Sequence, residues 1–353
     1  MKVSLFDLLN IYEGEVKKNV RNKKKLLDFE KHKMEYLVDI KYVLENNLYD
    51  GGKYNIFLVF EPKVRVIMAQ GIYDKIINHY VTRYILIPKL EKYLNNRNCA
   101  TRKNMGTSYA IKLLKQDIES FKKYNKFYFL KLDISKYFYN IDHEVIISIV
   151  KQDLTIDELN LVRTILSSTN KEYINKKIEY LEKKYNVLLP KYEYGKGLAI
   201  GNLTSQFFAI LYLSKLQHYI TNNLHIKYIN YMDDYIFIHN SKEYLKYSLE
   251  LIKNIINNEY KLKFNDKKTF ISNSNQGISF LGYTFRVRNK KTIIKLSSNT
   301  KKNIRKGIKR ANYLYKNNII KFNQYFSSIE CFKNNYIFVN RDKVKHFIDR
   351  YNG

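Results

Sequence analysis

The segment YINYMDDYIFIH, at residues 228–239, constrains the fold more than any other part of the chain. Two adjacent carboxylates, Asp233 and Asp234, interrupt a run of apolar and aromatic side chains that would otherwise be buried. Because burial of an unpaired carboxylate is costly and neighbouring like charges repel, a compensating group should lie near the pair. A divalent metal ion, a nearby Lys or Arg, or solvent at a turn would serve. The apolar flanks predict a strand on each side of a turn.

The charge balance of the whole chain indicates a polyanionic partner. Lys and Arg number 63 against 33 Asp and Glu among 353 residues, which gives a net charge of +30. The abundance of Lys, Asn, Ile and Tyr is typical of an AT-rich genome, but codon bias does not require acidic residues to be so scarce. A basic excess of this size favours nucleic acid or an anionic membrane surface, and nucleic acid is the stronger expectation.

Other global features indicate a reduced, intracellular setting. Cys99 and Cys331 are far apart and match no metal-ligand spacing, so a structural zinc site is not expected. The N-terminal residues carry acidic side chains where a signal peptide would have its apolar core, and no apolar run approaches the length of a membrane span. We therefore expect a soluble cytoplasmic protein with no membrane partner.

Local patterns predict a mixed α+β fold. Residues 1–54 have a basic helical pattern, and two short β-rich runs follow around Pro62 as a hairpin. The other expected strands lie at 127–133, 228–239, 261–272 and 277–287, and the other expected helices at 72–95, 107–123, 143–150, 241–259 and from 299 onward. Residues 151–190 have no clear pattern. Because the strands cluster instead of alternating with helices, an antiparallel sheet is favoured over a doubly wound parallel one.

A Gly-rich loop at 195–201 leads into what the pattern predicts to be one long helix. Asn202, Thr204 and Ser205 stand where they would cap its N-terminus.

Three aspartates in this order suit nucleotidyl transfer. Such a site needs carboxylates that hold two divalent cations, one activating the attacking 3′-hydroxyl and the other neutralising the triphosphate and the leaving pyrophosphate. A strand that ends at Asp133, beside a hairpin tip that carries Asp233 and Asp234, would supply them. Each element alone is weak evidence, because Asp is common at turns. The order and spacing together carry the argument.

The ordered motifs resemble those of reverse transcriptases from bacterial retroelements. KLDISKYFYNIDH at 131–143, GLAIGNLTSQFFAILYL at 197–213 and YMDD at 231–234 resemble motifs A, B and C of that family. LKFNDKKTFI at 262–271 resembles motif D, and FLGYTF at 280–285 resembles the primer grip. Motif B ends in Ser-Gln where the retroviral and group II intron pattern has Ser-Pro. This form is most similar to the reverse transcriptases of diversity-generating retroelements and antiphage-defence systems.

The resemblance implies a right-hand polymerase. Residues 1–54 would form an N-terminal helical basic segment, and residues 55–290 would form the fingers and a palm with an antiparallel sheet. Residues 291–353 would form a helical thumb.

The resemblance also assigns site residues by position. Two Mg²⁺ ions, for which Mn²⁺ could substitute, would be held by the catalytic Asp133, Asp233 and Asp234. Lys268 would donate a proton to pyrophosphate, with Lys267 as its rival. The incoming nucleotide would be contacted by Lys63, Arg65, Phe138, Gly201, Ser205 and Gln206. The primer grip would be formed by Phe280, Leu281 and Gly282. Nucleic acid would be bound by Arg102, Lys301, Lys302, Arg305, Lys306, Lys309 and Arg310.

Phe138 has a specific expected role. It lies five residues after Asp133, where a bulky ring would crowd a ribose 2′-hydroxyl and select deoxynucleotides. Viral RNA-dependent RNA polymerases tend to place Asp at this offset and usually have Gly-Asp-Asp as motif C. The competing interpretation is that Phe138 packs in the core.

The function implied is an RNA-directed DNA polymerase that makes cDNA. Its partners would be an RNA template such as a dedicated non-coding RNA, a DNA or RNA primer, dNTPs, and an accessory protein or a second copy of the chain. Its role, in antiphage defence or in a diversity-generating retroelement, is left open. The alternatives are a non-catalytic RNA-binding maturase or chaperone and a polyanion binder without a site. The set of three aspartates argues against the maturase or chaperone, since buried charges are costly to keep. The ordered motifs argue against the polyanion binder.

Overall fold

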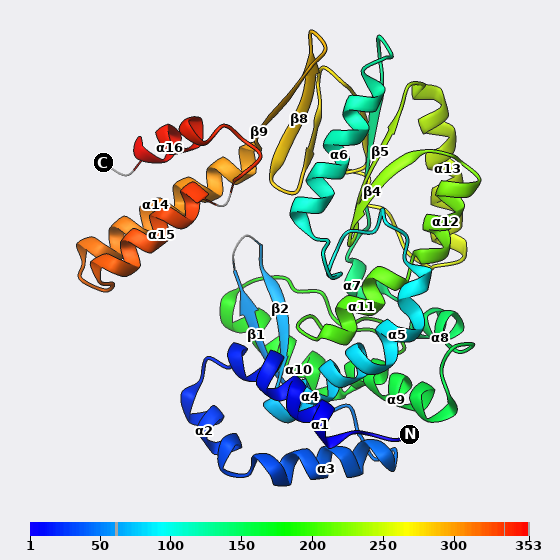
Figure 1. The fold of residues 1–353 in the computed structure, drawn as a ribbon, viewed down its shortest axis with the longest axis vertical. Coiled ribbons are helices and arrows are strands. Elements are labelled where there is room, and N and C mark those ends of the chain that lie inside the picture. The colour runs from blue at the N-terminus through cyan, green and yellow to red at the C-terminus, as the bar shows by residue number, and fades with distance from the viewer. Residues whose placement is uncertain (61–62, 335, 352–353) are drawn as a thin grey trace.

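The centre of the molecule is a four-stranded antiparallel sheet in the order β4-β5-β3-β6. The computed structural model describes residues 1–60, 63–334 and 336–351, and Figure 1 shows how their elements are arranged. The strands of this sheet are β3 (Tyr128–Asp133), β4 (Lys227–Tyr231), β5 (Asp234–His239) and β6 (Phe270–Asn273). β4 and β5 form the hairpin predicted at 228–239, and β3 pairs with both β5 and β6.

The inner strands are buried on both faces, which explains their nearly continuous apolar sequences. Because side chains alternate along a strand, Tyr235 and Phe237 pack into one core, while Ile236 and Ile238 pack into a second core on the opposite face. The first face is covered by α13 (Lys242–Asn258), and the second by α6 (Thr107–Phe121).

Helices from the middle of the chain extend the first core. They are α7 (Tyr137–Asn140), α8 (His143–Val150), α9 (Ile156–Ser167), α11 (Leu203–Leu211) and α12 (Ser214–Asn222), with a 3-10 turn at Ser168–Asn170. The buried side chains of α10 (Glu172–Tyr185) belong instead to a third, smaller core. The unpatterned residues 151–190 thus contain two regular helices. The hairpin of β1 (Tyr54–Val59) and β2 (Arg65–Gln70) packs against α10, and its expected tip at 61–62 lies outside the described residues.

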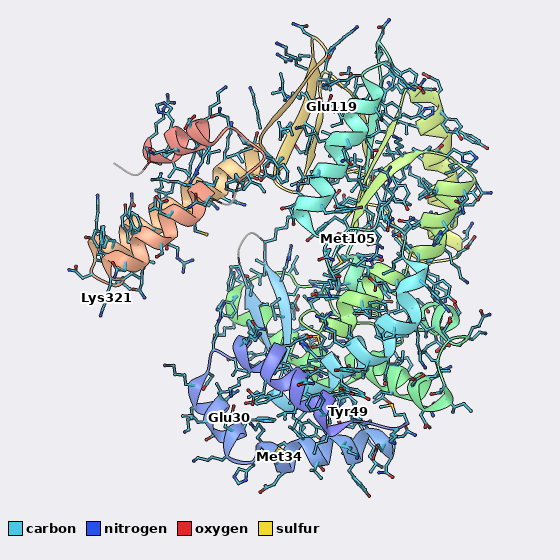
Figure 2. The ribbon with its side chains drawn as sticks, viewed as in Figure 1. Glu30, Met34, Tyr49, Met105, Glu119 and Lys321 are labelled. Carbon is cyan, nitrogen blue, oxygen red and sulfur yellow. The ribbon has the colours of Figure 1, made fainter. Side chains whose placement is uncertain are left out.

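The N-terminal segment forms a helical layer beside this hairpin. It consists of α1 (Leu5–Ile11), a π-helical turn (Tyr12–Val16), a 3-10 turn (Lys17–Asn19), α2 (Lys23–Lys31) and α3 (Lys33–Glu45). The Tyr12 hydroxyl donates a 2.6 Å hydrogen bond to Glu30, which ties the start of the layer to α2. Figure 2 labels Glu30 on this helix. The layer packs on α4 (Ile72–Tyr80), which continues through a π-helical segment (Val81–Leu86), α5 (Ile87–Leu90) and a 3-10 turn (Glu91–Tyr93).

A separate three-stranded sheet leads into the C-terminal helices. Its strands are β7 (Ile278–Phe280), β8 (Tyr283–Arg288) and β9 (Lys291–Leu296), followed by α14 (Ser298–Lys316), α15 (Phe322–Asn334) and α16 (Arg341–Asp349). All three helices contribute side chains to the second core. The boundary expected between palm and thumb at residue 290 falls between β8 and β9 of this one sheet. That division stays a prediction.

The α+β class with antiparallel sheets is confirmed, but two local predictions are wrong. Of the strand expected at 261–272, only the residues from Phe270 onward form a regular strand, β6, and Phe264 makes an isolated bridge to Ile134. The polar stretch before it forms turns, in which the amide of Asn265 donates to the carbonyl of Asp133 at 2.9 Å. The single long helix expected after the Gly-rich loop is broken at Leu213 into α11 and α12. Among the described residues, no helix combines the length and apolar character needed to cross a bilayer.

Replacement of Phe237 should test the packing of the central strand. Phe237 is fully buried and its ring lies 5.9 Å from those of Tyr228 and Tyr235. We expect Phe237→Ala to lower the free energy of unfolding by about 3–5 kcal/mol through lost burial and a residual cavity. Urea denaturation measures this. The control is Phe270→Ala on the edge strand, where 46% of the residue is exposed; an equal loss in both variants would contradict the assignment.

Candidate active site

Two strands and a tight turn bring the three aspartates together. The register of β3 and β5 places Asp133 directly opposite Asp234. Tyr231 pairs with Asp234 across the β4–β5 hairpin, so Met232 and Asp233 form its two-residue turn. Met232 has φ +58°, a conformation that residues other than glycine rarely adopt. The side-chain amide of Asn230 donates a 2.6 Å hydrogen bond to the carbonyl oxygen of Met232. The hairpin tip is thereby fixed beside the end of β3.

Lysines provide the compensating charge that the sequence requires. The ammonium group of Lys268 lies 2.8 and 2.9 Å from the two carboxylate oxygens of Asp133. The ammonium group of Lys131 lies 3.0 Å from Oδ2 of Asp234 and donates to the carbonyl of Ser279 at 3.0 Å. Sequence reasoning missed Lys131, although the two-residue period of β3 places it on the face of Asp133, diagonal to Asp234.

Burial leaves the hairpin carboxylates short of partners. It raises the pKa of Asp234 to about 6, against the opposing effect of Lys131, and it also raises the pKa of Asp233. Within the described part of the chain, Oδ1 of Asp234 is buried and accepts no hydrogen bond. Such an oxygen calls for a cation or a donor.

The donor set fits a hard divalent cation, although the side chains are arranged around lysines. Carboxylate oxygens are the ligands that Mg²⁺ and Mn²⁺ prefer, and the bare Oδ1 of Asp234 adds a free ligand atom. Among residues 1–60, 63–334 and 336–351, no group of three His, Cys, Asp or Glu side chains is gathered closely enough to hold a metal ion. As they stand, Asp133, Asp233 and Asp234 do not form such a group; they would hold an ion only if Lys268 moved away from Asp133.

The loop before α11 lies tightly against β2. The amide of Met68 donates a 2.8 Å hydrogen bond to the carbonyl of Ile200. Gly201 follows with φ +137°, and a Cβ built on it would lie 2.8 Å from the carbonyl oxygen of Met68. Ser205 is buried and Gln206 is half-buried at the start of α11. Glycine is thus required by the close approach of the two segments.

The expected capping of α11 is not observed. Asn202 occupies the N-cap position without a side-chain capping bond, and its amide donates instead to the hydroxyl of Tyr54 at 3.1 Å. Thr204 donates to Asn78 at 2.6 Å, and Asn78 donates to Gln70 at 2.6 Å. These side chains are buried, so they find partners in the protein interior and link the loop to β2 and α4.

Other predicted nucleotide contacts lie around this loop. Phe138 is half-buried on α7, packs at the edge of the first core, and its carbonyl accepts a 2.7 Å hydrogen bond from the amide of Leu198. The left-handed Lys136 (φ +46°) supplies the bend expected before it. Lys63 and Arg65 are exposed, with Arg65 at the start of β2. Whether these residues contact a nucleotide stays a prediction.

The remaining predicted residues lie in different surroundings. Phe280 is buried in the second core, while Leu281 and Gly282 form the β7–β8 turn with positive φ angles. The Arg102 guanidinium donates to the carbonyls of Leu94, Asn95 and Asn98 and pairs with Glu91. This use of its donors disfavours the predicted contact with nucleic acid. Lys267 and Lys268 are both exposed, but Lys268 is the one whose ammonium group contacts Asp133.

Comparison with known proteins identifies the family. The family model described as "Reverse transcriptase (RNA-dependent DNA polymerase)" matches residues 61–285. The chain belongs to the reverse transcriptase family. The matched region of this reverse transcriptase includes the segments that carry the three aspartates and the Gly-rich loop, which are residues 131–143, 197–213 and 231–234.

Similar proteins cover this reverse transcriptase only in part. The group II intron-encoded protein LtrA of Lactococcus lactis subsp. cremoris is 37% identical over 122 residues, which is 34% of this chain and 18% of LtrA. The same match is found for strain MG1363. Two structures of apo telomerase from Candida tropicalis are 17% and 15% identical, with a TM-score of 0.48 each. The two alignments cover 69% and 85% of this chain and 55% and 56% of the telomerase chains.

Substitution of Gly201 should test the contact between the loop and β2. Gly201→Ala adds a Cβ against the Met68 carbonyl and also strains the backbone, so we expect it to destabilise the protein by about 2 kcal/mol or more. The control is Gly106→Ala, where φ is +113° but no atom lies within 4 Å of the added Cβ. Thermal unfolding should show a clearly larger loss for Gly201→Ala; equal losses would mean that the contact is unimportant.

Proposed function

We propose that the protein is an RNA-directed DNA polymerase that makes cDNA by two-metal nucleotidyl transfer. The observation that carries the proposal is the placement of Asp133 opposite Asp234, with Asp233 in the adjoining turn, in a chain of the reverse transcriptase family. The alignment covers only 18% of LtrA, so the activity, substrates and partners of this chain are not taken from LtrA. They are proposed from the residues of this chain.

Each residue of the site has a proposed task. Asp133, Asp233 and Asp234 hold Mg²⁺ or Mn²⁺, which when bound would activate the primer 3′-hydroxyl and neutralise the triphosphate. Lys268 leaves Asp133 and becomes the donor that protonates the departing pyrophosphate. The exposed Lys63 and Arg65 on the β1–β2 hairpin contact the incoming triphosphate.

The wider assignment follows the same proposal. The substrates are an RNA template, a DNA or RNA primer and dNTPs, and the net charge of +30 suits such polyanions. Residues 55–290 serve as fingers and palm and residues 291–353 as thumb, in the cytoplasm. The cellular role is cDNA synthesis in antiphage defence or in a diversity-generating retroelement, with a dedicated non-coding RNA and an accessory protein or second copy as partners.

One observation favours a non-catalytic RNA-binding maturase or chaperone as the second candidate. Lys268 and Lys131 already neutralise Asp133 and Asp234 as an ordinary ion-pair cluster would. A binding protein could keep the aspartates for this structural purpose. The bare Oδ1 of Asp234 argues against it, because a purely structural pair gains nothing from an unsatisfied buried oxygen.

Removal of the hairpin charges separates the two candidates. We expect the double variant Asp233→Asn, Asp234→Asn to stay folded and to lose metal-dependent dNTP incorporation on a primed RNA template by about a thousandfold or more, since bound metals supply several kcal/mol of transition-state stabilisation. The control is Asp266→Asn, which removes an exposed carboxylate from the neighbouring turn. Unchanged incorporation by the double variant would remove the assignment.

Phe138 should set the choice of sugar. If its ring crowds the 2′-hydroxyl, Phe138→Val admits rNTPs and raises the ratio of ribo- to deoxynucleotide incorporation by up to about a hundredfold, or about 3 kcal/mol. A residue that only packs in the core would lose stability and would lower the rates with both nucleotides equally. Steady-state kinetics with dGTP and GTP on one template, beside a melting curve, distinguish these outcomes. An unchanged ratio in a folded, active variant would refute the gate.

A further inference from the structure

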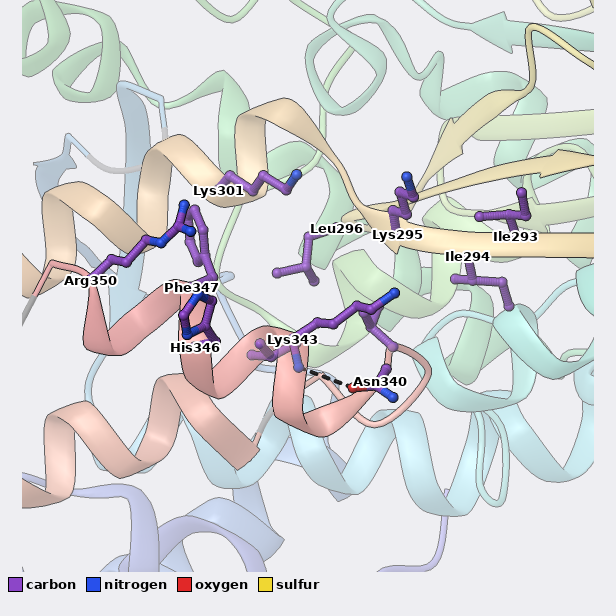
Figure 3. A pocket seen from close by; sticks show the side chains of 12 residues that line it. Ile293, Ile294, Lys295, Leu296, Lys301, Asn340, Lys343, His346, Phe347 and Arg350 are labelled. Carbon is purple, nitrogen blue, oxygen red and sulfur yellow. Dashed lines mark hydrogen bonds between the residues drawn. The ribbon is translucent and has the colours of Figure 1, made fainter.

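A pocket lies between β9, α14 and α16, on elements that carry none of the three aspartates (Figure 3). Its volume is about 390 Å³, within the range of small-ligand sites. Residues 293–296 of β9 form one wall, and the turn before α16 together with one face of α16 forms the other, with Lys301 of α14 at one end. The pocket is therefore a concave site separate from the residues of the proposed polymerase chemistry.

Positive charge from three elements gathers around this pocket. Its lining includes four permanent cations and no carboxylate; the cations are Lys295, Lys301, Lys343 and Arg350. Within the described part of the chain, none of the four forms an ion pair, and the nearby Asp349 is held by Lys333 at 3.5 Å. Because four like charges repel one another across the pocket, an anion would be bound favourably there.

The same pocket has an apolar surface that an inorganic anion would not use. Ile294, Leu296, Val344 and Phe347 supply it. The guanidinium carbon of Arg305 lies 5.4 Å from the Phe347 ring centroid and 5.0 Å from that of Tyr351, which adds positive charge at the border. A ligand that matches both features has a phosphate group and a flat, weakly polar body.

We propose that this pocket binds a nucleotide unit, with its phosphate among the lysines and Arg350 and its base against the apolar wall. This proposal takes one element from the proposed function, which is that the protein binds nucleic acid. The nucleotide has two sources, an unpaired residue of a bound RNA strand or a free nucleotide. Both offer the phosphate and the stacking surface that the pocket recognises.

The location of the pocket distinguishes it from a template–primer track. In Figure 1, α16 lies on the far side of α14 and α15 from the β1–β2 hairpin. Lys301 lines the pocket and Arg305 covers the rings of α16, so we assign these two residues to this site. The other basic residues of α14 are exposed and would contact the template–primer duplex; they are Lys302, Lys306, Lys309 and Arg310. RNA bound at α16 would thus be held in addition to the copied strand.

Matched charge reversals on α16 test the proposal. Lys343 lines the pocket, whereas Lys345, two residues along the same helix, is exposed and does not. Fluorescence anisotropy with a labelled single-stranded uridine RNA, without metal or dNTPs, reports binding alone. We expect Lys343→Glu to weaken binding about tenfold and Lys345→Glu about twofold or less. Phe347→Leu, which keeps apolar volume but removes the ring, should also weaken binding.

Two further measurements complete the test. Melting curves that match the wild type show that the variants are folded. Adenosine monophosphate added as competitor identifies the source: displacement of the RNA at low concentration supports a free-nucleotide site, and failure to displace it supports a residue of the strand. Equal loss in Lys343→Glu and Lys345→Glu, or no loss in Lys343→Glu, overturns the proposal. Because no polymerisation is measured, an inactive polymerase would leave this result unaffected.

Discussion

The antiparallel pairing of β3 with β5 is the constraint on which the candidate site depends. It sets Asp133 opposite Asp234, and a slip of one residue would turn one of these carboxylates toward the other face of the sheet. The alternating burial of Tyr235, Ile236 and Phe237 in two separate cores opposes such a slip, because every one of these side chains would then face the wrong core. The packing of the residues that follow Asp234 in β5 therefore determines the geometry of the site.

The same burial makes the carboxylates costly to charge, and two lysines offset part of this cost. Desolvation raises the pKa of Asp234 to about 6, and Lys131 and Lys268 bind the carboxylates of Asp234 and Asp133. Lys131 also bonds to the backbone of β7, so it connects the aspartates to the second sheet. In our account Asp133 would hold a divalent ion only when it is free of Lys268, and Lys268 would then be available as a proton donor.

The sequence predicts the parts of the site that depend on local pattern. The apolar runs on both sides of Asp233 and Asp234 predict the hairpin, and the order of motifs predicts the partner strand that ends at Asp133. Lys131 was accessible to the same reasoning. The contacts of Arg102 and Thr204 could not be predicted from the sequence, because their partners become neighbours only through folding. Arg102 donates to the carbonyls of Leu94, Asn95 and Asn98, and Thr204 donates to the side-chain oxygen of Asn78. The turn at 261–269 was missed because short alternating patterns occur in loops as well as strands.

The measurement that tests the account most directly is the number of Mn²⁺ ions bound by the protein with an RNA–DNA primer–template and a non-hydrolysable dNTP, counted by electron paramagnetic resonance. The account predicts two ions, both lost when Asp133 is changed to Asn in a protein that still binds the primer–template. It also predicts that Lys268→Ala strengthens metal binding, because the competing ammonium group is gone. Binding of no Mn²⁺ by the wild type, or binding unchanged by Asp133→Asn, would contradict it.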